Sequence, residues 1–171
     1  RARRRRYRYY LDGDPDRAGR LRSIAGLLGD RVDARSFGRG LGGSTPQFRP
    51  LSRIQVAQDG LDTWIEVEAH AFVWGMVRKI VTGICEVESG RRSPADLVRA
   101  ARGEQRLTLA LAPPEPLVLW EVEYDLPWTH FASGRTRHQE AHLREVERQA
   151  RLLPALLRAL GSGPAEPPSS G

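Results

Sequence analysis

The stretch "SRIQVAQDGLDTWIEVEAHAF", residues 52–72, contains two runs in which apolar and polar side chains alternate, with Asp59-Gly60 between them. Such alternation is typical of strands that bury one face, and Asp-Gly is a strong hairpin signal. The spacing predicts a turn somewhat longer than two residues. The set expected to face the core is Ile65, Val67 and Ala69, in preference to a set beginning at Trp64.

The sequence before this hairpin predicts a strand, a helix and a loop. "RRRYRYYL", residues 4–11, is rich in aromatic side chains and alternates weakly, which favours a strand. Pro15 is expected to open a helix that runs to about Leu28 and ends at Gly29. Residues 30–50 are rich in Gly, Ser and Pro, and no helix or strand is predicted there; "GRGLGGSTP", residues 38–46, is expected to be loop.

After the hairpin the apolar period becomes helical, from Val73 to about Ser89. "SPADLVRAARG", residues 93–103, predicts a second short helix with Ser93 as its N-cap. "LVLWEVEYDL", residues 117–126, predicts a final strand. The order β-α-β-β-α-(α)-β indicates an α+β, ferredoxin-like (split β-α-β) domain: a four-stranded antiparallel sheet with helices on one face and the other face open.

Three segments are expected along the chain. Residues 1–127 form the α+β domain. Residues 128–160 form a charged helical extension with an apolar stripe at helical spacing, and Pro154 is expected to kink or split it. Residues 161–171 form a flexible tail.

Composition narrows the function classes. The 171 residues carry a formal net charge of +6, which favours a polyanionic partner such as nucleic acid or a membrane surface. The single cysteine, Cys85, excludes a disulfide framework and favours a cytoplasmic location. No apolar run has the length of about 20 residues that a membrane span needs. The absence of an initiating Met indicates a fragment.

The most basic segment lies at the start of the chain, beside Tyr7, Tyr9 and Tyr10. Arginine neutralises phosphate, and a tyrosine ring offers a base a stacking surface. The alternative is a solvated basic end on an ordinary strand. The residues expected to bind RNA are Arg3, Arg4, Arg5, Arg6, Arg8 and, on the helix expected from Val73 to about Ser89, Lys79.

A second cationic feature lies within "AFVWGMVRKIVTG", residues 71–83, where Arg78 and Lys79 interrupt an apolar run. A charge in an apolar segment must reach water or find a partner. Arg78 therefore either extends its head to solvent or is held against a carboxylate or phosphate in a cleft. The residues alone slightly favour the first interpretation.

Other chemistry-bearing residues favour structural roles. His138 and His142 are spaced like metal ligands but lack the following Glu of a zinc-protease motif, so no metal site is predicted. Cys85 is expected to be a buried, inert thiol. The glycine-rich "GRGLGGS" lacks a Walker lysine and is a weak phosphate-loop candidate, although its Arg39 could still contact a phosphate. The pairs Glu66/Glu68 and Glu121/Glu123 are expected to lie on solvent faces and serve solubility.

Four segments, in order, resemble the TruA family of tRNA pseudouridine synthases, in its C-terminal half. They are "ARRRRYRYYL", "DARSF", "AHAFVWGMVRKIVTGICEVESGRRSP" and "LALAPPEPLVLWEVEY". The third resembles the family's helix Phe-x-x-x-Met-Val-Arg-x-Ile-Val-x-Gly. The resemblance covers about residues 2–125. One departure is Trp74-Gly75, where many members carry a His pair.

The resemblance implies an enzyme that converts uridines of the tRNA anticodon stem-loop to pseudouridine without a cofactor, as a homodimer. It implies that Tyr7 stacks on the target base and takes part in proton removal. It also implies that Arg78 pairs with the catalytic Asp, and that Leu117 packs against uracil. The family's Arg-Thr-Asp-x-Gly-Val-His-Ala motif, which carries that Asp, is absent here. The partner of Arg78 is therefore expected on an N-terminal half that this chain lacks, and the chain alone is expected to be inactive.

Two other classes remain open. A non-catalytic, RRM-like RNA-binding module has the same topology but needs aromatic residues on a central strand, where "TWIEVEAHAF" places Glu66 and Glu68. A pure dimerisation domain would leave Arg78 unexplained and would show no salt-dependent RNA affinity.

Overall fold

The computed structural model describes residues 2–11, 15–59 and 62–125, which belong to the first of two units in the chain, Arg1–Pro127. The elements, in chain order, are β1 (Ala2–Leu11), α1 (Pro15–Gly26), β2 (Arg31–Asp33), α2 (Ala34–Phe37), β3 (Phe48–Pro50), β4 (Arg53–Asp59), β5 (Asp62–Ala69), α3 (Met76–Glu88), α4 (Pro94–Ala101) and β6 (Leu117–Tyr124). The helical extension and tail expected after residue 127, with His138 and His142, lie outside the described residues.

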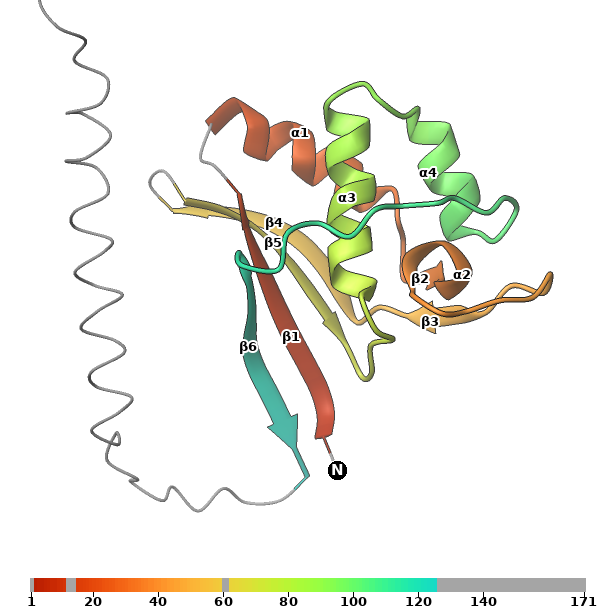
Figure 1. Ribbon diagram of the computed structural model, residues 1–171. Helices are drawn as coiled ribbons and strands as arrows, with labels where there is room; N and C mark the ends of the chain where they lie inside the picture. Colours follow the sequence, from red (N-terminus) through yellow and green to blue (C-terminus); the bar gives the residue numbers. More distant parts are fainter. Residues whose placement is uncertain (1, 12–14, 60–61, 126–171) are drawn as a thin grey trace, which may run out of the picture. The chain divides into compact units, whose positions relative to one another are not determined.

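The main sheet has four strands in the order β4-β5-β1-β6, and each neighbouring pair is antiparallel. Helices α1 and α3 lie on the same face of this sheet (Figure 1). The α+β, ferredoxin-like prediction is thus confirmed. β1 is a central strand, since it pairs with β5 on one side and with β6 on the other.

The hairpin of β4 and β5 forms as predicted, with one difference. Asp59 pairs with Asp62, so the two strands are joined by two residues, and the expectation of a longer turn was wrong. Ile65, Val67 and Ala69 are fully buried, which confirms the predicted core face of β5.

Helix α3 buries its apolar stripe against the sheet: Met76, Val77, Ile80, Val81, Ile84 and Val87 are buried. The helix begins at Met76, three residues later than predicted, because Gly75 adopts a left-handed conformation with φ of 75°. Gly90, with φ of 73°, follows its C-terminal end. The predicted N-cap of α4 is confirmed, since the Ser93 hydroxyl accepts from the backbone N–H of Asp96.

The loop predicted for "GRGLGGSTP", residues 38–46, is confirmed, but three short elements around it were missed. β2 pairs with β3 in a separate two-stranded sheet, and the four-residue helix α2 follows β2. The buried Asp33 carboxylate accepts from the backbone N–H groups of Arg35 and Gln47, and Phe37 is fully buried. Elements of three or four residues are too short to show a period in the sequence, and only the stretch between α2 and β3 remains irregular.

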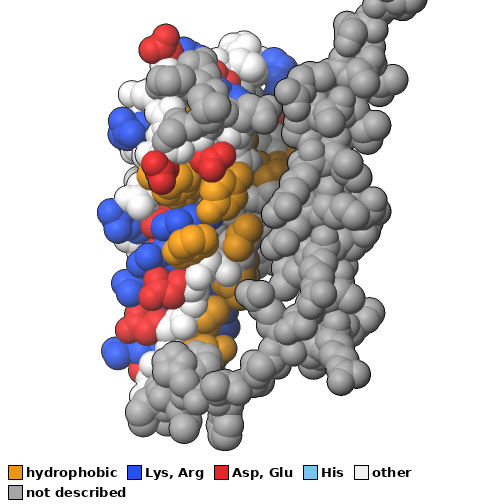
Figure 2. Space-filling model, turned by 90° about the vertical axis from the view of Figure 1, so that its left-hand side faces the viewer, with side chains coloured by type: hydrophobic (Ala, Val, Ile, Leu, Met, Phe, Trp, Pro, Cys, Tyr) orange, Lys and Arg blue, Asp and Glu red, His pale blue; other side chains and the backbone are white. Residues whose placement is uncertain are grey.

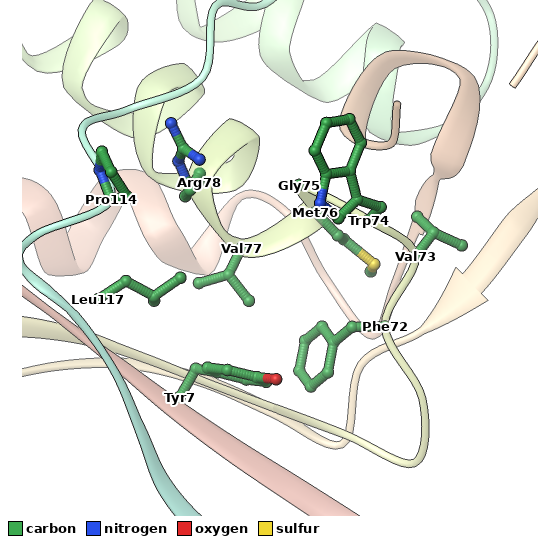
Figure 3. A pocket seen from close by; sticks show the side chains of 10 residues that line it. All are labelled: Tyr7, Phe72, Val73, Trp74, Gly75, Met76, Val77, Arg78, Pro114 and Leu117. Carbon is green, nitrogen blue, oxygen red and sulfur yellow. The ribbon is translucent and has the colours of Figure 1, made fainter. Parts of the chain in front are cut away.

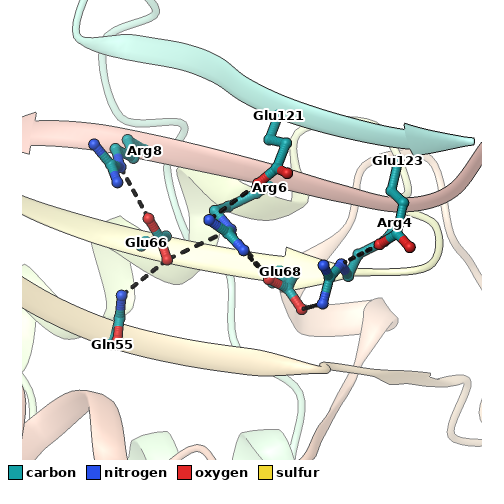
Figure 4. Close-up of polar contacts among 8 residues, drawn as sticks. All are labelled: Arg4, Arg6, Arg8, Gln55, Glu66, Glu68, Glu121 and Glu123. Atoms are coloured by element: carbon teal, nitrogen blue, oxygen red, sulfur yellow. Dashed lines mark hydrogen bonds and ion pairs between the residues drawn. The ribbon is translucent and has the colours of Figure 1, made fainter. Parts of the chain in front are cut away.

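The face of the sheet opposite the helices carries a network of arginines and glutamates (Figure 4). Glu66 and Glu68 are 1% and 4% exposed, so the expectation that they face solvent was wrong. Glu66 accepts from Nε of Arg8 at 2.8 Å, and Glu68 accepts from Nη2 of Arg6 at 3.1 Å. The arginines of β1 cover these carboxylates because β1 lies beside β5. A cross-strand neighbour of this kind cannot be read from one strand alone.

The outer glutamates of this network behave as predicted. Glu121 and Glu123 have side chains that are 50% and 44% exposed, and they pair with Arg6 and Arg4 at 3.0 and 2.9 Å. Basic and acidic side chains are consequently interleaved on the side of the molecule that Figure 2 presents, next to a band of hydrophobic side chains.

Candidate active site

A cavity of about 480 Å³ lies between β1, the start of α3 and the segment that leads into β6. Its volume falls in the range of roughly 300–1,000 Å³ that is usual for ligand pockets. Ten residues line it (Figure 3): Tyr7, Phe72, Val73, Trp74, Gly75, Met76, Val77, Arg78, Pro114 and Leu117.

Arg78 lies in the first turns of α3 and is partly buried. Its Nε donates to the backbone carbonyl of Ala112, which ties the guanidinium to the segment before β6. Among the described residues, no carboxylate lies within ion-pairing distance of Arg78. The guanidinium thus has a fixed position at the cavity and no acidic partner in this part of the chain.

Tyr7 reaches the cavity from the middle of β1, where it pairs with Val67 on β5 and Leu119 on β6. Its ring meets that of Phe72 edge to face, with centroids 5.1 Å apart and planes at 88°. Tyr7 and Phe72 also border a second cavity of about 400 Å³. Figure 3 shows the Tyr7 hydroxyl directed toward Phe72. The Tyr7 side chain, an aromatic ring with a polar hydroxyl, therefore borders both cavities.

Leu117 opens β6 and lies across the cavity from Phe72 (Figure 3). Its backbone N–H donates to the carbonyl of Pro114 at 3.1 Å, and the N–H of Tyr10 donates to Pro116. These bonds hold the proline-rich segment against β1. Tyr7, Arg78 and Leu117, which the sequence resemblance groups in one site, are therefore brought to one cavity from three distant parts of the chain.

The basic residues predicted to bind RNA do not line this cavity. Arg4, Arg6 and Arg8 form the ion pairs on the opposite face of the sheet. Arg3 pairs with Asp125 at 2.8 Å, where both side chains are more than half exposed.

The other two predicted RNA-binding residues donate to backbone carbonyls. Arg5 lines the second cavity and donates to the carbonyl of His70 at 2.9 Å. Lys79 donates from Nζ to the carbonyl of Gly38 at 2.7 Å. Among the described residues, no group of three or more potential metal ligands is present.

The sequence reasoning missed Phe72, Pro114 and Trp74 as cavity residues. Phe72 and Trp74 lie in the short connection between β5 and α3, and a connection from a strand to a helix is a frequent place for site residues. Their position just before the Met-Val-Arg segment was the available signal. Arg39 was noted only as part of the weak phosphate-loop candidate, and its contact with Trp74, with the guanidinium 4.0 Å from the ring centroid, was not predicted.

The described helices include none that is both long and apolar enough to cross a bilayer.

Comparison with known proteins gives a consistent result. Residues 25–125 match a family described as "tRNA pseudouridine synthase". The chain is 34% identical over 137 residues to the tRNA pseudouridine synthase A of Methanoculleus marisnigri, covering 78% of this chain and 49% of that protein. It is 32% identical over 147 residues to that of Thermococcus kodakarensis, covering 86% of this chain and 54% of that protein.

A third relative, the tRNA pseudouridine synthase A of Methanococcoides burtonii, is 36% identical over 131 residues, which cover 76% of this chain and 47% of that protein. The chain therefore spans about half the length of the curated relatives it matches.

Proposed function

This chain belongs to the TruA family of tRNA pseudouridine synthases, and from that premise we propose that the full-length protein isomerises uridine to pseudouridine in the anticodon stem-loop of tRNA. The observation that carries the proposal is the cavity that unites Tyr7, Arg78 and Leu117. In this reaction the bond from the ribose C1′ to N1 of uracil breaks, the base turns, and a C1′–C5 bond forms. The proton lost from C5 is balanced by one gained at N1, so no cofactor is needed.

The cavity suits a base that has left its helix. An enzyme that acts on a base must extrude it and give it a stacking surface in a pocket. We assign that surface to the Tyr7 ring, with Leu117 packing on the uracil from the other strand. The Tyr7 hydroxyl is then the candidate for proton removal at C5. Its position in the middle of the sheet gives it a rigid support on both sides.

Arg78 is the proposed partner of the catalytic Asp, which we place in an N-terminal half outside this chain. An adjacent guanidinium favours the ionised form of a carboxylate, as a nucleophile requires. Two observations support the assignment. The Arg78 head is fixed by Ala112 at the cavity, and no described carboxylate pairs with it. The Arg78 guanidinium is thus held at the cavity and can still pair with a carboxylate from outside this chain.

We also propose that the full-length protein acts as a homodimer in the cytoplasm with tRNA as its partner, and that this chain alone is inactive. Arg5 has no ion pair among the described residues and can contact a phosphate directly. Arg3 would first have to leave Asp125, its partner in an exposed ion pair. Arg4, Arg6 and Arg8 would first have to exchange a glutamate for a phosphate, because each is ion-paired.

The RRM-like alternative gains little from the open face of the sheet. Its central strands carry the buried carboxylates of Glu66 and Glu68, where such a module needs stacking rings. Two indoles do lie on this side, but the Arg8 guanidinium covers both, at 3.6 Å from the Trp120 centroid and 4.9 Å from that of Trp64.

The test uses full-length protein and a tRNA transcript labelled with tritium at C5 of uridine. Pseudouridine formation releases the label, and reverse-transcription stops after carbodiimide treatment map the modified position. We expect release by the full-length protein and none by residues 1–171 alone. Failure of the full-length protein to release tritium from any tRNA would disprove the proposed function.

The role of Arg78 has its own readout. Arg78→Ala should abolish turnover while changing the Kd for tRNA by less than about threefold, because the guanidinium is expected to act on the Asp rather than on a phosphate. Arg78→Lys should also be severely impaired, because the single ammonium group of lysine cannot donate to the Ala112 carbonyl and to the catalytic Asp with the planar geometry of a guanidinium. A matching loss of tRNA affinity would instead identify Arg78 as a phosphate contact.

A further inference from the structure

A group of cations surrounds an exposed indole at the rim of the cavity. We call it the Trp74 patch and define it as Arg39, Trp74, Lys79 and Arg106. Trp74 lines the cavity but is 63% exposed, and the Arg39 guanidinium lies over its ring at 4.0 Å from the centroid. Burial lowers the pKa of Lys79 below its ordinary value, and the nearby charges of Arg106 and Arg39 lower it further. The three cations therefore repel one another.

No described carboxylate compensates this charge. Within residues 2–11, 15–59 and 62–125, nine arginines form ion pairs with Asp or Glu: Arg3, Arg4, Arg6, Arg8, Arg17, Arg20, Arg35, Arg92 and Arg99. In that same part of the chain, Arg39, Lys79 and Arg106 form none. Clustered cations without counter-charges are the usual footprint of a polyanion site.

The patch rests on an anchored loop. The backbone N–H of Arg39 donates to the carbonyl of Trp74 at 3.0 Å, and Lys79 holds the carbonyl of Gly38. Arg106 donates to the carbonyl of Leu41 at 3.0 Å. These bonds fix the loop between α2 and β3 on both sides of Arg39. The cations are thus held in place before any ligand arrives, which reduces the entropic cost of binding.

We propose that the Trp74 patch binds the RNA strand next to the target uridine, with backbone phosphate on Arg39, Lys79 and Arg106 and a neighbouring base stacked on Trp74. The proposal rests on the proposed function, because the cavity beside the patch is taken to receive the uridine. It assigns the main phosphate contacts of this unit to the loop between α2 and β3, the start of α3 and the segment after α4, rather than to the arginine-rich β1, whose charges are largely paired. The Arg39 guanidinium occupies one side of the indole, so a neighbouring base would stack on the rest of the ring, which belongs to a side chain that is 63% exposed. Stacking on an aromatic side chain is how single-stranded segments are commonly held.

The test measures tRNA affinity of the full-length protein by fluorescence anisotropy over a range of KCl concentrations. Arg39→Gln/Arg106→Gln should weaken binding by about tenfold or more near physiological salt, and it should reduce the slope of log K against log[salt] by roughly 2, one for each lost phosphate contact. The matched control is Arg91→Gln, an exposed arginine beyond the other end of α3 whose guanidinium contacts the Ser89 hydroxyl. It should leave both quantities unchanged.

Trp74→Ala should weaken binding about fivefold or more without changing the salt slope, because stacking releases no counterions, and Trp74→Phe should recover part of the loss. The proposal is overturned if the double variant keeps the parental slope, or if Arg91→Gln reduces it equally. Tritium release by the parental protein is measured in parallel. An unchanged slope with normal release defeats the Trp74 patch alone, whereas absent release defeats the proposed function.

Discussion

The carboxylate of Glu66 accepts a hydrogen bond from Nε of Arg8 at 2.8 Å and is almost completely buried at 1% exposure. Gln55 donates to its other oxygen at 2.8 Å. Both oxygens are therefore satisfied, as a buried charge requires.

Removing this buried carboxylate should destabilise the fold strongly. We expect Glu66→Ala to reduce the free energy of unfolding by about 3–5 kcal/mol, because it leaves the Arg8 charge without its buried partner. Glu121→Ala is the matched control: its side chain pairs with Arg6 but is 50% exposed, so its loss should cost less than about 1 kcal/mol. Denaturant unfolding measures both, and equal losses would contradict the distinction.

The buried pair of Asp33 and Arg35 should make stability depend on acid. Burial by itself raises the pKa of Asp33, but hydrogen bonds from the Arg35 side chain and from the backbone N–H groups of Gln47 and Arg35, with the Arg35 charge, bring it below its ordinary value. A carboxyl group whose pKa is lower in the folded state stabilises the fold above its unfolded pKa of about 3.9. That contribution is lost as the pH falls through the lower, folded value.

We expect Asp33→Asn to be less stable at neutral pH and to lose less further stability between pH 5 and pH 2 than the parental protein. Urea unfolding midpoints across this range provide the measurement. Parallel curves for the two proteins would show that the Asp33 carboxylate does not carry this acid sensitivity.

Gly75 should tolerate no side chain, for two separable reasons. Its φ of 75° is left-handed, which costs another residue about 1–2 kcal/mol. A Cβ there would also lie 2.7 Å from Cδ2 of Leu111. Gly90 has a similar φ of 73° but open space around its missing Cβ, so Gly90→Ala carries the backbone cost alone.

Because the atom that the Cβ would meet is the end of a partly buried leucine side chain, which can shift, we expect Gly75→Ala to lose about 1 kcal/mol more than Gly90→Ala, at the low end of the cost of overpacking. The double variant Gly75→Ala/Leu111→Ala should remove that excess, measured against Leu111→Ala. Because Gly75 directly precedes α3, the same substitution should also impair turnover by displacing Arg78. Equal stability losses for Gly75→Ala and Gly90→Ala would show that the Leu111 side chain moves aside at no measurable free-energy cost.

The thiol of Cys85 should react slowly. Cys85 is partly buried rather than fully buried as predicted. Burial is still the largest influence on its thiol and raises its pKa, so less of the reactive thiolate is present at neutral pH. Because Cys85 is the only cysteine in the chain, alkylation by iodoacetamide reports on this group alone. We expect a rate at pH 7.5 at least about tenfold below that of the urea-unfolded protein, and similar rates would contradict a protected thiol.

Sequence reasoning succeeded where a residue's environment is set by its own segment. The alternation of Ile65 and Val67 identified the buried face of β5, and the helical stripe of residues 76–88 identified α3. It failed where the environment comes from elsewhere in the chain. Nothing in β5 itself shows that arginines of β1 lie across Glu66 and Glu68.

The site divides in the same way. The resemblance named Tyr7, Arg78 and Leu117, and the structure places all three at one cavity. Arg39 was noted only as part of a weak loop candidate. Its contact with Trp74 depends on how the loop between α2 and β3 folds back on the start of α3, which neither segment encodes alone.

The cross-strand pairing of β1 changes what the pI of about 10.4 means for this protein. Counting arginines suggests a broad cationic surface, but an approaching polyanion meets a nearly neutral mosaic along β1, where positive and negative groups alternate every few ångströms. Total charge then attracts the RNA from a distance without dictating where it lands. Its orientation would then be set where several cations without a carboxylate partner lie together, as they do in the Trp74 patch.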